Sequence, residues 1–151
     1  MGDQAVFESP HELDFPYTRS LGPTLSAFMT GLRDGKITGT RGDGGRVIVP
    51  PTEYDPISSA PTEGSVNVGP GGVLTSWTWI DKPKPSHPSD KPFAWAMVKL
   101  DGADTAMLHI LKAPSADGIA SGMRVSAQFR PEAERVGCMA DIAAFIPEEG
   151  S

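Results

Sequence analysis

The stretch that decides the fold is residues 37–61, ITGTRGDGGRVIVPPTEYDPISSAP. It has the outline of a zinc ribbon, in which two tight turns bring four thiolates together around one ion. The segment GRV at 45–47 and the Pro50-Pro51 pair stand where such a ribbon has its first strand and its crossover. None of the residues at the four ligand positions can supply a thiolate; they are Arg41, Gly44, Asp55 and Ser58. We therefore expect a degenerate, metal-free ribbon over residues 37–63.

Arg41 and Asp55 occupy the first and third ligand positions and carry opposite charges. We expect an ion pair between them that bridges the two turns in place of the metal; the alternative is that both charges are solvated. A structural zinc contributes on the order of 10 kcal/mol to folding in zinc peptides. An exposed ion pair contributes only about 0.2–1 kcal/mol. Pro50, Pro51 and Pro56 would offset part of the difference, because proline lowers the entropy of the unfolded chain.

The composition narrows the class of protein. The length of 151 residues is typical of one domain. A formal net charge of −6 disfavours nucleic acid as a partner, because phosphate binding requires a basic surface. The sequence has no run of 18 apolar residues that could span a bilayer and no N-terminal secretory pattern. The single Cys138 excludes an internal disulfide and fits a reducing compartment, so we expect a cytoplasmic protein that contacts no membrane.

One helix is predicted, over residues 21–36. Gly22-Pro23 opens it, because proline is favoured in the first helical turn, and Gly35 marks its end. Apolar residues recur at helical spacing, at Leu21, Leu25, Phe28, Met29 and Leu32. This apolar face could pack on the protein's own sheet or contact a partner protein.

Residues 1–20 are predicted to be a partly flexible lead-in, and residues 148–151 a short tail. The lead-in contains apolar residues that could dock on another surface, namely Phe7, Leu13, Phe15 and Tyr17. The chain could be a free-standing protein or a domain cut from a fusion.

Residues 64–147 are predicted to form a barrel of short strands. The strands are expected at 73–80, 93–100, 105–111, 122–129 and 142–146, where β-branched and aromatic residues are concentrated. Four prolines in residues 81–92 predict a loop, and Asp101-Gly102 predicts a hairpin turn. The expected fold is mainly β: an N-terminal helix, a degenerate ribbon and a five-stranded OB-fold barrel.

Six short segments, taken together, indicate a protein family more specifically than any one of them does. They occur in order at 32–37, at 45–47 with Pro50-Pro51, and at 72–78, 92–102, 122–125 and 145–147. In this succession the chain resembles the acyl-CoA-associated OB-fold family, first catalogued as a domain of unknown function, which carries a rubredoxin-like zinc ribbon before its barrel. The sequence departs from that family at the zinc ligands.

The resemblance implies a non-catalytic accessory subunit without a cofactor. Members of the family are implied to dock, as hetero-oligomers, on thiolase-fold enzymes that handle coenzyme A thioesters. The segment FPYTRS at 15–20 followed by Gly22-Pro23 looks most like the branch that partners thiolase-like aldolases of steroid side-chain degradation. In that branch the barrel is often fused behind a hot-dog hydratase domain, a second candidate partner.

Partner-facing residues are predicted from their aromatic or apolar character, because tryptophan is enriched at interface hot spots. The candidates are Leu25, Phe28, Met29, Trp77 and Trp79, with Trp95 as a further aromatic. At least one of the tryptophans is expected to belong to the barrel core instead.

A catalytic constellation is not apparent in the sequence. The three histidines, His11, His87 and His109, lie apart, and Cys138 has no histidine at a spacing that would activate it. Two other functions remain open at this stage. Trp77 and Trp95 could stack bases in a single-strand nucleic-acid-binding OB-fold, or the chain could be an independent hydrolase or lyase acting on acyl-CoA.

Overall fold

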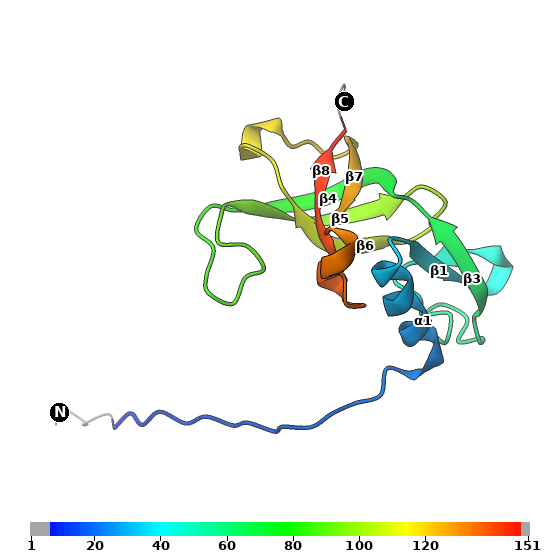
Figure 1. Cartoon of the computed structure of the whole chain (residues 1–151), viewed down its shortest axis with the longest axis horizontal. Helices are drawn as coiled ribbons and strands as arrows, with labels where there is room; N and C mark the ends of the chain where they lie inside the picture. The colour runs from blue at the N-terminus through cyan, green and yellow to red at the C-terminus, as the bar shows by residue number, and fades with distance from the viewer. Residues whose placement is uncertain (1–6, 149–151) are drawn as a thin grey trace, which may run out of the picture.

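The computed structural model describes residues 7–148, which form one α-helix, a three-stranded sheet and a closed five-stranded barrel (Figure 1). The elements are α1 (Gly22–Arg33), β1 (Ile37–Arg41), β2 (Val47–Ile48), β3 (Glu63–Val68), β4 (Gly71–Ile80), β5 (Phe93–Leu100), β6 (Ala106–Leu111), β7 (Arg124–Phe129) and β8 (Ile142–Pro147). Short 3-10 turns are η1 (Asp43–Gly45), η2 (Ala116–Gly118), η3 (Glu132–Glu134) and η4 (Met139–Asp141). The predicted mainly β fold is confirmed. Parts of the predicted lead-in and tail, 1–6 and 149–151, lie outside the described residues.

The barrel has the strand order β4-β5-β6-β8-β7, and β7 pairs with β4 to close it. This arrangement is consistent with the predicted OB-fold. A bulge between Leu74 and Ser76 bends β4, so that this one strand pairs with both β5 and β7. Gly72 makes this close approach possible, because a Cβ there would lie 2.6 Å from the carbonyl oxygen of Lys99.

The predicted strands agree with the barrel to within two residues at each end, and residues 81–92 contain no strand or helix. The turn at Asp101 and Gly102 joins antiparallel β5 and β6, with Gly102 at a φ of 86°. This positive φ explains why glycine occupies the second turn position.

The three-stranded sheet has the order β2-β1-β3. Its third strand corrects a predicted boundary, because we expected the barrel to begin at residue 64. Instead β3 pairs antiparallel with β1, in the register Ile37↔Val68 and Gly39↔Val66. The alternating sequence EGSVNV predicts a strand but carries no signal of which strand it pairs with.

The helix α1 covers the junction between this small sheet and the barrel. Phe28 and Leu32 are 1% and 0% exposed and belong to the same apolar cluster as Val47 of the small sheet and Phe145 of the barrel. The helix ends at Arg33, three residues earlier than predicted. Two residues further on, Gly35 takes a φ of 73°, which is typical of the residue that follows a helix C-cap. Helix, small sheet and barrel therefore share one core.

Residues 7–20 have no regular secondary structure, and each of them is exposed. In Figure 1 this lead-in is an extended segment that leads away from the barrel and the small sheet. Its large apolar side chains are therefore in contact with solvent, including Phe15 at 75% and Tyr17 at 78% exposed.

Candidate functional site

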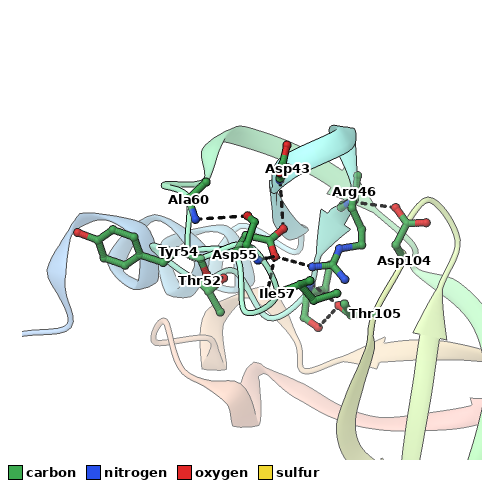
Figure 2. A network of polar contacts seen from close by, with 12 residues as sticks. Asp43, Arg46, Thr52, Tyr54, Asp55, Ile57, Ala60, Asp104 and Thr105 are labelled. Carbon is green, nitrogen blue, oxygen red and sulfur yellow. Dashed lines mark hydrogen bonds and ion pairs between the residues drawn. The ribbon is translucent and has the colours of Figure 1, made fainter.

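Asp55 lies between the two turns at which a zinc ribbon would bind its metal (Figure 2). Its side chain is 1% exposed. Oδ1 accepts hydrogen bonds from the Arg46 guanidinium at 2.7 Å and from the Ile57 N–H at 2.8 Å. The Ser58 N–H donates to the same oxygen at 3.3 Å, and Oδ2 accepts from the Asp43 N–H at 3.1 Å. One carboxylate thus links both turns; we call this arrangement the Asp55 knuckle.

The cation of the knuckle is Arg46, which corrects the expected pair of Arg41 with Asp55. Arg41 is the last residue of β1 and is exposed. The preceding residue, Thr40, is buried and bonded to the carbonyl of Thr52 at 3.3 Å. Because successive side chains of a strand point to opposite faces, Arg41 faces solvent.

The residues of the knuckle do not fit a zinc ion. Among the four template positions only Asp55 carries a ligand atom suited to the metal, and both of its oxygens already accept protein hydrogen bonds. Across residues 7–148, no group of three or more His, Cys, Asp or Glu side chains is arranged to hold a metal. The knuckle is therefore a hydrogen-bonded structure in its own right.

Packing supplies more stability here than the ion pair. Five apolar side chains in the small sheet or directly after β2 are less than 8% exposed, namely Ile37, Val47, Ile48, Val49 and Val68. Burying one such side chain contributes about 1.5–3 kcal/mol. The shared apolar core therefore outweighs an ion pair of the strength expected from the sequence, and the role of Asp55 is to fix the two turns on that core.

The knuckle is tied to the barrel by two residues that the sequence analysis missed. The Val47 N–H donates to Asp104 Oδ2 at 2.8 Å, and the Asp104 N–H donates to the Val47 carbonyl at 2.8 Å. Thr105 Oγ1 accepts from the Val49 N–H at 2.8 Å and donates to the Val49 carbonyl at 2.9 Å. The only signal in the sequence is a pair of polar residues directly after the β5–β6 turn.

Gly42 lines the carboxylate pocket, and a Cβ on it would lie 2.1 Å from Asp55 Oδ2. Its φ of −87° is ordinary, so a side chain would meet steric conflict alone, with this carboxylate and with Ile48 Cδ1 at 2.9 Å. We expect Gly42→Ala to lower the Tm by roughly 5–10 °C, because the carboxylate must leave its donors. Gly118→Ala is the matched control, since nothing lies within 4 Å of a Cβ there. Equal Tm values for the two variants in differential scanning calorimetry would refute the packing assigned to Gly42.

Hydrogen bonding lowers the pKa of two buried carboxylates. The Ile57 N–H lowers the pKa of Asp55 most, burial opposes it, and the Ser58 N–H and Arg46 add to the lowering. At Asp141 burial raises the pKa, but the N–H groups of residues 136–138 outweigh it, and the pKa again lies below its ordinary value. Both carboxylates are therefore ionised in the folded protein at neutral pH.

Stability is expected to fall modestly between about pH 7 and pH 5, because folding lowers the pKa of His109 from 6.5, and to fall further below the ordinary aspartate pKa of 3.8. The sign follows from linkage: a pKa lowered by folding means that the unfolded chain takes up the proton first, so acid favours unfolding. Urea midpoints at about pH 7, pH 5 and pH 3.5 measure this. An unchanged midpoint at the lowest pH would mean that the two carboxylates do not stabilise the fold.

One of the five predicted interface residues is a core residue, and the other four are half-buried. Phe28 is 1% exposed, so the expectation that it faces a partner is wrong; α1 turns its apolar face onto the protein's own core. Met29, Trp77 and Trp79 are half-buried and pack against that core. Leu25 is half-buried as well. For the half-buried residues a role in docking stays a prediction.

The exposed apolar side chains lie elsewhere. Leu13, Phe15 and Tyr17 of the lead-in are 70–78% exposed, and Ile57 of the knuckle is 78% exposed. The sequence analysis noted the lead-in residues but not Ile57. These side chains are available to a partner without any rearrangement of the core.

The two candidate catalytic side chains, His109 and Cys138, make hydrogen-bond contacts within the fold. His109 Nε2 lies 3.2 Å from the carbonyl oxygen of Met139, and burial lowers the pKa of the imidazole although the carbonyls of Met139 and Ile110 oppose this. Cys138 Sγ lies 3.6 Å from Asp141 Oδ1, on a carboxylate that also accepts backbone N–H groups. No hydrogen bond joins His109 and Cys138 in the described part of the chain, so they do not form a nucleophile–base pair.

Comparison with known proteins identifies the barrel. Residues 65–130 match the family model described as ChsH2, C-terminal OB-fold domain. This stretch is similar to the ChsH2 C-terminal OB-fold domain. The match spans most of β3 and continues through β7, and it confirms the resemblance drawn from the six segments. No curated protein matches the sequence.

Two solved structures resemble the whole arrangement around the ChsH2-type barrel. A chain of the Ltp2-ChsH2(DUF35) aldolase superposes with a TM-score of 0.63 and 17% identity, covering 86% of this chain and 98% of that one. A DUF35-family protein of unknown function from Sulfolobus solfataricus superposes with a TM-score of 0.56 and 21% identity, covering 71% of this chain and 77% of that one. At these identities the likeness establishes the fold.

Strands β1 and β2 and both turns of the knuckle lie outside the family match, which begins at residue 65 within β3. The descent of the small sheet from a zinc ribbon therefore remains a prediction from the spacing of its turns. In the described structure no helix is long and apolar enough to cross a membrane.

Proposed function

We propose that this chain is a non-catalytic accessory subunit, or a domain of one, that docks on a thiolase-fold aldolase acting on an acyl-CoA. A steroid side-chain-cleaving aldolase is the proposed partner. The observation that carries the proposal is the ChsH2 match over residues 65–130. The superposition over 98% of a chain of the Ltp2-ChsH2(DUF35) aldolase supports it, because the match takes in 86% of this chain and so extends well beyond residues 65–130.

The state of the polar groups supports a docking role over an independent hydrolase or lyase. His109 is bonded to a backbone carbonyl, and Asp141 is saturated by backbone N–H groups. A general base must be free to take a proton from substrate or nucleophile. The Asp141 carboxylate lacks that freedom, and burial opposes protonation of His109 by lowering the pKa of its imidazole.

The single-strand nucleic-acid alternative has weaker support. Stacking proteins present aromatic side chains along a basic groove. Here Trp77 packs against the core, and the whole chain carries 19 acidic against 13 basic residues. A protein partner suits this surface better than phosphate does.

The lead-in is the proposed docking arm. Leu13, Phe15 and Tyr17 alternate along the extended chain, and alternate side chains of an extended segment lie on one face. Aromatic anchors of this kind dominate binding energy when they enter a partner's pocket. Ile57 at the exposed edge of the Asp55 knuckle is proposed as a second contact.

Co-expression tests the proposal. The full chain is produced with a thiolase-fold aldolase of the Ltp2 type, and separately with a biosynthetic thiolase as control, and each mixture is analysed by size exclusion with light scattering. We expect a stable hetero-oligomer with the aldolase and none with the control thiolase. A chain that elutes alone beside every thiolase-fold aldolase would refute the docking role.

A further inference from the structure

We propose that a pocket on the side of the barrel binds a small amphipathic anion, with an apolar body and a single carboxylate or sulfonate group. The cavity has a volume of about 320 Å³ and lies where β5, β6 and the start of β8 meet residues from the loops 81–92 and 130–141. Ligand pockets usually measure about 300–1,000 Å³ and are apolar with a few polar groups. The size therefore suits one small ligand.

The wall of the pocket is built from side chains on rigid elements. Trp95 of β5 is held edge-on against Phe93, with ring centroids 5.3 Å apart. Leu108 and Ile110 of β6 lie on the same side of their strand, and Leu108 is 55% exposed. Met139 of η4 completes the apolar lining. An apolar wall on neighbouring strands keeps its shape without a ligand, so little ordering cost opposes binding.

The charge of the pocket differs from that of the protein. The chain has a net charge of −6, yet none of the residues lining this cavity is a carboxylate, and Arg130 is the one lining residue with a formal charge. Within residues 7–148 the Arg130 guanidinium makes no ion pair; the hydrogen bonds of Arg130 are those of its backbone, from its N–H to the Asp141 carbonyl at 2.8 Å and from Arg135 Nε to its carbonyl at 2.7 Å. A free cation beside an apolar wall selects a ligand of opposite charge with an apolar body.

The histidine of the pocket does not compete for that role. His109 Nε2 is engaged by the Met139 carbonyl at 3.2 Å, and its ring packs edge-on against Phe145 at a centroid distance of 5.8 Å. It contributes a flat surface to the lining, and Arg130 remains as the partner for the anionic group. In OB-fold barrels the face of the second and third strands is a general place for ligands, and β5 and β6 occupy these positions here.

The site is separate from the lead-in and the Asp55 knuckle, so the inference stands independently of the proposed docking role. The probes are 1-anilinonaphthalene-8-sulfonate, which combines an aromatic body with one anion, and decanoate as a competitor. With the full chain we expect saturable binding of one probe per chain, measured by fluorescence, and displacement by decanoate.

Two variants locate the site. Arg130→Glu reverses the charge and should weaken binding about tenfold or more, because a charge-assisted hydrogen bond becomes a repulsion. Ala143→Phe should abolish binding by filling the cavity, which Ala143 lines. Arg33→Glu is the matched control, since Arg33 is exposed on α1 and outside the pocket.

The readouts keep the inference open to refutation. Arg130 is exposed, so its variant should keep the wild-type far-UV circular dichroism and Tm even if Ala143→Phe destabilises the barrel. Unsaturable probe binding, or equal affinity in wild type and Arg130→Glu, would overturn the proposal. So would a pocket that takes no probe in the free chain and is protected from hydrogen exchange only when a protein partner is present, since that result assigns the face to the partner.

Discussion

Replacing Asp55 by asparagine is expected to lower the Tm by roughly 10 °C. The carboxylate accepts from Arg46 and from three backbone N–H groups. An amide offers one oxygen and turns an NH₂ group toward the remaining donors. Thermal unfolding followed by circular dichroism measures the shift.

The control for this substitution is Asp43→Asn. Asp43 is in the facing turn of the knuckle, and its backbone N–H, not its exposed side chain, binds Asp55. The control should leave the Tm within about 1 °C of wild type.

The wild-type protein should bind no stoichiometric zinc and should keep its Tm in chelator. Co-purification with zinc and unfolding in chelator would contradict the description of the knuckle.

The double substitution Phe15→Ser and Tyr17→Ser is expected to abolish complex formation with the partner aldolase while leaving the Tm unchanged. Interface anchors typically cost at least 2 kcal/mol each on truncation, so the two together should weaken binding by 100-fold or more. The fold should be unaffected, because both side chains are more than 70% exposed. Isothermal titration of the variant against the aldolase measures the first effect and calorimetric unfolding the second.

Asp14→Ser with Thr18→Ser is the matched control. These residues occupy the alternate face of the same extended segment and are also exposed. Binding should stay within a few-fold of wild type. If the Phe15 and Tyr17 variant still assembles normally, the docking arm must be sought elsewhere, and Ile57 becomes the next residue to substitute.

The barrel was predictable because each of its strands has a local sequence signal. β5 was predicted residue for residue, since FAWAMVKL alternates large and small apolar side chains between a proline-rich loop and an Asp-Gly turn. The start of α1 followed equally from Gly22-Pro23. The stop signal at Gly35 was also correct, since Gly35 takes a φ of 73° directly after the C-cap Asp34; only the predicted range, which ran to residue 36, was too long.

The partner of Asp55 was not predictable from ligand spacing. Gly44 and Gly45 both take positive φ, at 70° and 79°, so the turn reverses the chain and brings Arg46 back over the carboxylate. A template that counts positions along the sequence places Arg41 there instead. The backbone N–H groups that replace the other ligands carry no signature in the sequence at all.

Long-range contacts set the remaining limit. The pairing of β3 with β1 and the bonds from Asp104 and Thr105 to the small sheet join segments far apart in sequence. Phe28 illustrates the same limit: its place in an amphipathic stripe was correct, but the surface that covers it belongs to the protein itself. The spacing of apolar residues shows that a face is buried, but it does not show which surface covers that face.

Acyl-CoA cleavage by the aldolase, assayed with and without this chain, tests the central claim most directly. The account predicts that the chain alone releases no product from any acyl-CoA, and that adding it at equimolar amounts raises the turnover or the thermal lifetime of the aldolase. The Phe15 and Tyr17 variant should fail to do so. Product formation by the isolated chain, or aldolase behaviour that is identical in its presence and absence, would contradict the account.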